Sequence, residues 1–219
     1  MPRSTGLAAL GATTRRVARA VVRPRLLPID WATPLPAATD PEAATEADAA
    51  WHGERAMADI AALLRHVPRC PGTPGQIATV AYIENEIAKT QRYRIERQSF
   101  TLPQPSGDGA IPLINLIARL DPEKPVRILI GTHHDSLVRA YRDPDSPDAP
   151  MPGANNSGSG VAVLLETARA LAATRAPAHV GVDLVFFDGE EGYGALGAGE
   201  ARWVPLGSSG FVRRFNDYY

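Results

Sequence analysis

The sequence has a single cysteine, Cys70, so it can form no disulfide within the chain, and its thiol does not indicate a compartment. It has no run of about 18 or more apolar residues, so no membrane-spanning helix is predicted. Its 23 basic and 24 acidic side chains nearly cancel, and a net charge of −1 is no reason to expect nucleic acid as a partner. A phosphate-binding glycine loop of the usual spacing is also missing, so nucleotide chemistry has no support.

The first 50 residues differ in composition from the rest. Residues 1–30 hold six arginines against one acid, Asp30, and residues 31–50 hold four acids and no base among prolines and alanines. We predict that segment 1–50 is a flexible basic arm followed by a linker, and that residues 51–219 form one domain. The arginines follow the short apolar run 7–11 instead of preceding it, so no clear signal peptide is indicated and the localisation stays open.

From residue 51 onward, apolar residues recur at helix and strand spacings. Helices are predicted over residues 51–67, 76–91 and 158–173. Strands are predicted over residues 93–102, 111–120, 126–131 and 182–187, and the last is wholly apolar, as expected for a strand buried on both faces. Because helices alternate with buried strands, the fold class is predicted to be α/β, a sheet sandwiched by helices.

Three polar clusters follow predicted strands or begin a helix. They are residues 131–136 (GTHHDS), 153–160 (GANNSGSG) and 188–192 (DGEEG). In open α/β sheets, ligands bind beyond the carboxyl ends of the strands, so these clusters are the first candidates for a site.

Within these clusters, two pairs of residues could build a metal site. His133 could bind a metal while Asp135, two residues on, orients its ring, and of Glu190 and Glu191 one could bind the metal while the other moves protons. Alone, each pair is more simply a surface His–Asp pair or a solvated acidic turn. Two adjacent carboxylates beside an apolar strand repel each other unless a cation offsets them, so the clusters together favour a metal site.

Taken in order, these motifs resemble the zinc aminopeptidase and glutaminyl cyclase superfamily. The resemblance covers residues 51–217 and includes the acidic string at residues 186–191 (FFDGEE). The turn at residues 69–75 (RCPGTPG), together with Trp203 and the following residues 206–208, favours the cyclase branch. This resemblance implies a mixed, mostly parallel sheet of the zinc exopeptidase kind and zinc, one ion or two, as the cofactor.

The resemblance also implies roles for individual residues. Glu191 matches a zinc-ligating glutamate and Glu190 the general acid/base. His133 and Asp135 match a His-x-Asp element whose histidine binds metal in two-zinc aminopeptidases but not in single-zinc cyclases, and we group Asp135 with the catalytic residues.

Two aromatic side chains are expected at the substrate. Trp203 matches a tryptophan that helps to wall the substrate pocket of cyclases, although a packing role explains it equally well from sequence. His134 is assigned to substrate binding as a pocket-wall residue, with packing as the alternative.

The sequence departs from the family pattern in two places. Asn156 falls at the position of a metal-binding aspartate, and its neutral amide should weaken metal binding. The matched segment also ends before the family's later strands, a further aspartate and a C-terminal histidine. We therefore expect a fold that is incomplete at the C-terminus, with an uncovered sheet edge that invites self-association.

The function implied by the resemblance is zinc-assisted cyclisation of an N-terminal glutamine with release of ammonia. In that reaction Glu190 takes a proton from the α-amine and later returns one to the ammonia. A zinc-dependent aminopeptidase and a non-catalytic remnant are the alternatives. The expected partners are the N-termini of peptides or proteins.

Overall fold

The computed structural model describes residues 51–103, 109–174, 178–192 and 203–219. The arm and linker predicted for segment 1–50 lie outside these residues.

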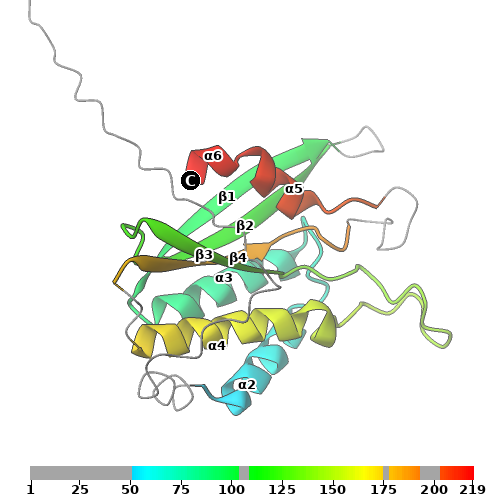
Figure 1. The fold of residues 1–219 in the computed structure, drawn as a ribbon. Helices are drawn as coiled ribbons and strands as arrows, with labels where there is room; N and C mark the ends of the chain where they lie inside the picture. The colour runs from blue at the N-terminus through cyan, green and yellow to red at the C-terminus, as the bar shows by residue number, and fades with distance from the viewer. Residues whose placement is uncertain (1–50, 104–108, 175–177, 193–202) are drawn as a thin grey trace, which may run out of the picture.

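The described chain forms a four-stranded sheet with helices packed against it (Figure 1). The strands are β1 (Tyr93–Pro103), β2 (Ala110–Leu120), β3 (Val126–His133) and β4 (Val180–Phe187). The helices are α2 (Gly53–Leu63), α3 (Pro74–Ala88), α4 (Gly160–Ala173), α5 (Leu206–Arg213) and α6 (Phe215–Tyr218), and a short 3₁₀ turn, Leu64–His66, follows α2.

The sheet is mixed and mostly antiparallel. Its strand order is β1-β2-β4-β3, with β1 antiparallel to β2, β2 antiparallel to β4, and β3 parallel to β4. An α/β fold is thus confirmed, but the prediction of a mostly parallel sheet is wrong for the described strands. A parallel pair needs a long crossover, and in the described part of the chain only α4 supplies one, between β3 and β4.

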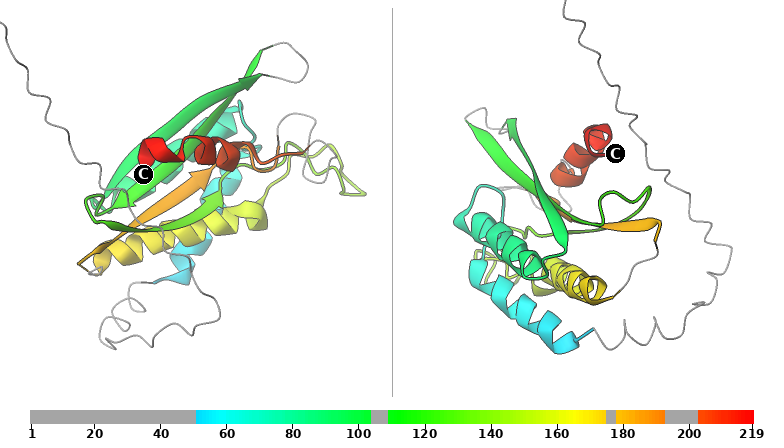
Figure 2. Two further views of the ribbon diagram at one scale, coloured as in Figure 1. Left: turned by 45° about the horizontal axis from the view of Figure 1, so that its top comes forward. Right: turned by 90° about the vertical axis from the view of Figure 1, so that its left-hand side faces the viewer.

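Helices lie on both faces of the sheet. Figures 1 and 2 show α2, α3 and α4 on one side and α5 with α6 on the other. Successive residues of β2 point to opposite faces, so Leu116 belongs to the main core under α3 and α4 while Ile117 packs toward Phe211 of α5. The buried apolar residues of the main core are Leu63, Val80, Ile83, Ile87, Leu116, Ala118, Leu120, Val161, Leu164, Leu165, Ala168, Val182, Leu184 and Phe186.

The turn before α3, at residues 69–75, contains prolines and glycines at positions where the backbone requires them. The Thr73 hydroxyl accepts a hydrogen bond from the Gln76 amide at 3.2 Å and caps the helix, while Pro74 occupies the first turn, where no backbone donor is needed. A Cβ on Gly75 would lie 2.0 Å from the His66 carbonyl oxygen, so only glycine fits there. The start of α3 is thereby packed tightly against the turn that carries Arg69.

Strand β3 forms one edge of the sheet. It pairs with β4 on one side, and no strand within the described residues pairs with its other side. Its side chains Ile128, Leu129 and Ile130 are 50%, 37% and 37% exposed. Three apolar side chains of this edge strand are therefore at least one-third exposed. None of the described helices has the length and apolar character needed to cross a membrane.

Candidate active site

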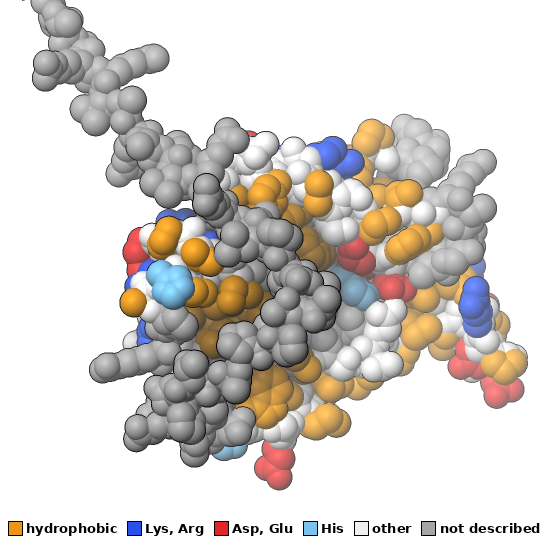
Figure 3. All heavy atoms as spheres, in the orientation of Figure 1, with side chains coloured by type: hydrophobic (Ala, Val, Ile, Leu, Met, Phe, Trp, Pro, Cys, Tyr) orange, Lys and Arg blue, Asp and Glu red, His pale blue; other side chains and the backbone are white. Residues whose placement is uncertain are grey.

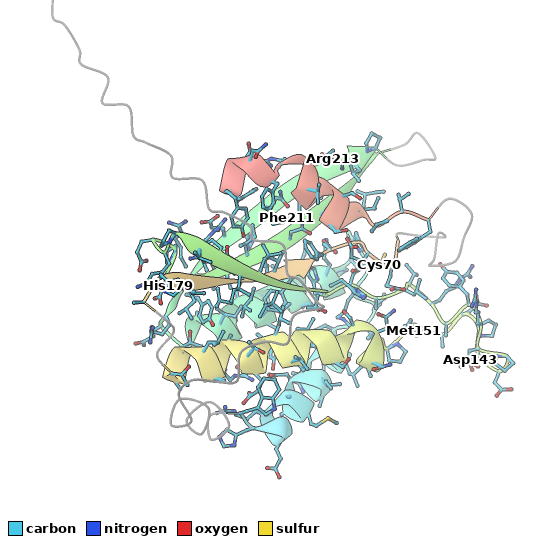
Figure 4. All side chains as sticks on the ribbon, viewed as in Figure 1. Cys70, Asp143, Met151, His179, Phe211 and Arg213 are labelled. Carbon is cyan, nitrogen blue, oxygen red and sulfur yellow. The ribbon has the colours of Figure 1, made fainter. Side chains whose placement is uncertain are left out.

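The predicted site residues converge beyond the carboxyl ends of β3 and β4. These two strands run parallel in a register that pairs His133 with Phe187, so the loops that follow both strands leave the sheet at the same edge. The irregular turn Ala154–Ser159 at the start of α4 brings Asn156 to the same place. In the space-filling view, acidic side chains and a histidine lie side by side to the right of centre (Figure 3). His179, by contrast, lies at the opposite end of the molecule (Figure 4).

Asn156 connects His133 to Glu191. The ring Nε2 of His133 lies 2.9 Å from the Oδ1 of Asn156, and the Nδ2 of Asn156 donates to the Oε1 of Glu191 at 2.8 Å. The His133 Nε2 and the Glu191 Oε1 are themselves 3.9 Å apart. These three side chains therefore form one hydrogen-bonded row.

Asp135 supports this row from behind. It is fully buried, and its Oδ1 accepts from the His133 Nδ1 at 3.2 Å and from the Glu190 amide at 3.1 Å. Its Oδ2 accepts from the Glu191 amide at 2.8 Å. Burial by itself lowers the pKa of His133, but the hydrogen bond and charge of Asp135, with smaller contributions from Asn156 and Glu191, outweigh it and raise that pKa. Asp135 thus orients the ring and both glutamates, which is a positioning role.

Glu190 points away from this row, toward the first turn of α5. Its carboxylate accepts from the Ser208 amide at 2.6 Å and from the Ser208 hydroxyl at 2.8 Å. Burial raises the pKa of Glu190 and the charge of Asp135 adds to this, while the hydrogen bonds from Ser208 oppose it. A carboxyl group with a raised pKa takes up a proton more readily than an ordinary one, which suits it to proton transfer.

The two expected substrate-binding aromatics lie in different environments. Trp203 is 37% exposed, and its indole Nε1 donates to the Glu190 carbonyl oxygen at 2.8 Å, so it stands beside the candidate general base. His134 is fully buried, and its Nε2 donates to the Ile114 carbonyl at 3.0 Å. The His134 ring is thus enclosed by protein, next to β2, in this structure.

Three further residues, to which the sequence analysis gave no role, also shape the site. Arg69 is 1% exposed and donates to the carbonyls of His134, Pro152 and Gly153 at 3.1, 2.7 and 2.9 Å, which ties the loop after β3 to the turn that carries Asn156. Asp188 is fully buried and accepts from the Ile114 amide at 2.9 Å and from Gln76. The third is Ser208, the partner of Glu190. Arg69 and Ser208 lie in segments noted only for the family resemblance, and nothing local to them indicates these contacts.

A pocket of about 380 Å³ opens beside Asn156 and Glu191. Its other walls come from Leu137, Met151, Pro152, Gly153, Ala154 and Asn155, so it is largely apolar. Met151 lies at the same end of the molecule as Cys70, near the start of α4 (Figure 4). The pocket could hold a small apolar group next to the Glu191 carboxylate.

The donor set does not fit a zinc ion. Catalytic zinc sites use three protein ligands, usually His or carboxylate groups, and the described residues contain no group of three or more His, Cys, Asp or Glu side chains placed to share a metal. The amide nitrogen of Asn156 faces Glu191 and its oxygen faces His133, so the facing polar atoms are already satisfied by hydrogen bonds.

The chain is similar to one protein-family model and to several solved structures. The family model "Peptidase family M28" matches residues 115–217. Among solved structures, Porphyromonas gingivalis glutaminyl cyclase is 27% identical with a TM-score of 0.66, covering 74% of this chain and 55% of that one. A leucine aminopeptidase precursor from Bacteroides thetaiotaomicron is 26% identical with a TM-score of 0.65, covering 77% and 58%.

A Zn-dependent exopeptidase from Parabacteroides distasonis is similar to the same extent, at 28% identity and a TM-score of 0.64, covering 74% of this chain and 55% of that one. No curated protein matches the chain. The chain thus spans little more than half the length of the solved structures that it resembles.

Proposed function

Because this chain belongs to the zinc exopeptidase superfamily that includes peptidase family M28, we propose that its site acts on the N-terminus of a peptide, as a glutaminyl-peptide cyclotransferase. The observation that carries the proposal is the placement of Glu190. Its partly buried carboxyl has a raised pKa and is held by Ser208, while the indole of Trp203 donates to the backbone carbonyl of the same residue.

In the proposed reaction, the α-amine nitrogen of an N-terminal glutamine attacks the γ-carboxamide carbon. The new C–N bond closes the ring, the bond to the carboxamide nitrogen breaks, and ammonia leaves. Glu190 accepts the proton that the amine loses and returns it to the departing nitrogen, so it ends the cycle as it began. Members of this family typically bind zinc, but no step is assigned to the ion, because the donor set described above does not fit it.

The other residues have positioning roles in this proposal. Asp135 holds the backbone of Glu190 and Glu191 through two amide hydrogen bonds, and Ser208 fixes the carboxylate of Glu190. Trp203 donates to the Glu190 carbonyl, and its exposed ring is proposed to form a wall for the glutamine side chain. Precise placement of the reacting groups contributes much of the rate acceleration in such a reaction.

Aminopeptidase activity is the second candidate, and the pocket beside Glu191 favours it. Its walls are largely apolar and its volume of about 380 Å³ falls in the range of small-ligand sites, so it suits an aliphatic N-terminal side chain. The similarity to a leucine aminopeptidase precursor is as strong as the similarity to the cyclases.

The test is a direct assay of the 219-residue chain, with and without added zinc. A glutamine-initiated peptide should release ammonia and yield the cyclised product in mass spectrometry, and Glu190→Gln should reduce the rate by about 100-fold or more, because the proton acceptor is lost. Glu54→Gln, a change at an exposed glutamate on α2, should leave the rate unchanged.

The two enzymatic candidates separate by product. Release of leucine from a leucine-initiated peptide without ammonia from the glutamine peptide would replace the cyclase with an aminopeptidase. Turnover of neither peptide would contradict both enzymatic candidates and favour a non-catalytic protein. Full activity of Glu190→Gln would contradict the role of that carboxylate as proton acceptor.

A further inference from the structure

The amide of Asn156 occupies the place between His133 and Glu191 that a shared metal ion would take. Its Oδ1 lies 2.9 Å from the His133 Nε2, and its Nδ2 lies 2.8 Å from the Glu191 Oε1. Both distances are those of ordinary hydrogen bonds, so the amide links the imidazole to the carboxylate without any further group.

The orientation of this amide follows from its partners. A carboxylate only accepts hydrogen bonds, so the group that faces Glu191 must be the NH₂ of Asn156. The oxygen of Asn156 then faces His133, whose Nε2 must donate to it. A ring nitrogen that donates in this way has no lone pair free for a metal ion, and the Asn156 oxygen points at that donor.

The charges around His133, Asn156 and Glu191 also disfavour a bound metal ion. Of the nearby carboxylates, Asp135 is engaged by two backbone amides and by His133, and Glu190 is engaged by Ser208. Glu191 is therefore the one carboxylate among the described residues that faces Asn156. A single anionic ligand offsets little of the cost of removing water from a doubly charged cation.

We propose that this centre is a hydrogen-bonded site in which the Asn156 amide takes the place of a metal ion, and that the single change Asn156→Asp converts it into a divalent metal site. A carboxylate at position 156 cannot donate to Glu191, so it loses one hydrogen bond and places a second negative charge beside the first. A cation held by His133, the new carboxylate and Glu191 relieves that repulsion. The inference concerns metal uptake and does not depend on which reaction the chain catalyses.

The experiment measures zinc affinity by competition with a chromophoric chelator, using the full chain. Asn156→Asp should bind zinc at least about tenfold more tightly than the unchanged chain, the scale on which altered ligand surroundings change metal affinity. Asn155→Asp is the matched control, because it adds the same charge one residue away at an exposed side chain. Its zinc affinity should stay close to that of the unchanged chain.

Thermal unfolding provides a second readout that involves no substrate. The melting temperature of Asn156→Asp should be lower than that of the unchanged chain without zinc and should rise when zinc is added, because a ligand that binds only the folded state stabilises it. The melting temperature of the unchanged chain should not respond to zinc at the same concentration.

Two results would overturn the proposal. One is uptake of one zinc per chain by the unchanged protein, lost in Glu191→Gln, with an affinity equal to that of Asn156→Asp. The other is an Asn156→Asp variant that binds zinc no more tightly than Asn155→Asp. If Asn156→Asp fails to fold, the comparison of zinc uptake by the unchanged chain and by Glu191→Gln decides alone. Uptake by the unchanged chain that is lost in Glu191→Gln refutes the proposal, and absence of uptake by the unchanged chain supports it.

Discussion

Buried polar residues position the candidate catalytic groups of this chain. Asp135 holds the His133 ring and the amides of Glu190 and Glu191 with its two carboxylate oxygens. Arg69 joins the loop after β3 to the turn before α4 through three carbonyl oxygens. Each of these groups is desolvated, so losing one partner would leave another polar atom buried and unsatisfied, which costs about 1–3 kcal/mol.

The buried carboxyl of Asp188 should make the folded state less stable as the pH rises. A carboxylate paired with a basic group has the opposite effect. Burial raises its pKa from 3.8 to about 6, with the charge of Asp135 adding to the effect. Between those two pH values the folded state binds more protons than the unfolded state, so the free energy of unfolding should fall as the pH rises through this window. The two-unit shift corresponds to a loss on the order of 3 kcal/mol.

The Asp188→Asn variant should lack this contribution. An amide oxygen can still accept from Ile114 and Gln76, so the variant should gain stability relative to the unchanged chain as the pH rises from 4 to 7. Urea unfolding at several pH values checks this, with Glu123→Gln as an exposed control. Parallel stability curves for Asp188→Asn and the unchanged chain would contradict the prediction.

At the scale of elements, α5 links the site to the second core. Its first turn carries Ser208, which holds the Glu190 carboxylate, and its last turns carry Phe211, which is 3% exposed. The Phe211 ring meets that of Phe187 edge to face at 5.5 Å and packs with Ile117 and Val185. Docking of α5 on the sheet therefore also determines where Glu190 is held.

Phe211→Ala should destabilise the chain by about 3–5 kcal/mol, the usual cost of deleting a buried aromatic side chain. Val212→Ala, one residue along the same helix and 68% exposed, should change stability by less than about 0.5 kcal/mol. Urea unfolding measures both changes. Equal effects of the two substitutions would show that α5 is not docked through Phe211.

At the scale of the whole molecule, the edge strand β3 is the most exposed apolar feature of the sheet. No described strand pairs with the outer side of β3, and the backbone groups on that side, beside the exposed side chains of Ile128, Leu129 and Ile130, can form a template for another strand. We propose that two copies of this chain associate through β3, since the same edge on each copy can pair with the other about a twofold axis.

Ile128→Lys should weaken that association by about tenfold or more, because a charged side chain on an edge strand opposes pairing. Sedimentation velocity over a range of concentrations measures the change. Ile77→Lys, at a 64% exposed side chain on α3, is the control and should leave the association intact. A chain that stays monomeric at all concentrations, or that responds equally to both changes, would contradict this proposal.

The strands and the first three described helices could be predicted closely from the sequence, because they depend on local periodicity, whereas α5 and α6 were not predicted. The strand predicted over residues 93–102 is observed as Tyr93–Pro103, and the helix predicted over residues 158–173 as Gly160–Ala173. The convergence of the three polar clusters was also predictable, since each follows a strand or begins a helix at the same edge of the sheet.

The sequence by itself thus determined the four strands, helices α2, α3 and α4 and the α/β class, because each of these depends on the spacing of apolar residues a few positions apart. Only the tertiary structure decided the strand directions, the inward packing of His134, the contact of Ser208 with Glu190, and the bridge made by Asn156. Those features depend on contacts between residues that are far apart in the chain, such as Asn156 and Glu191. Hydrophobic periodicity contains no information about which polar partner a buried side chain will meet.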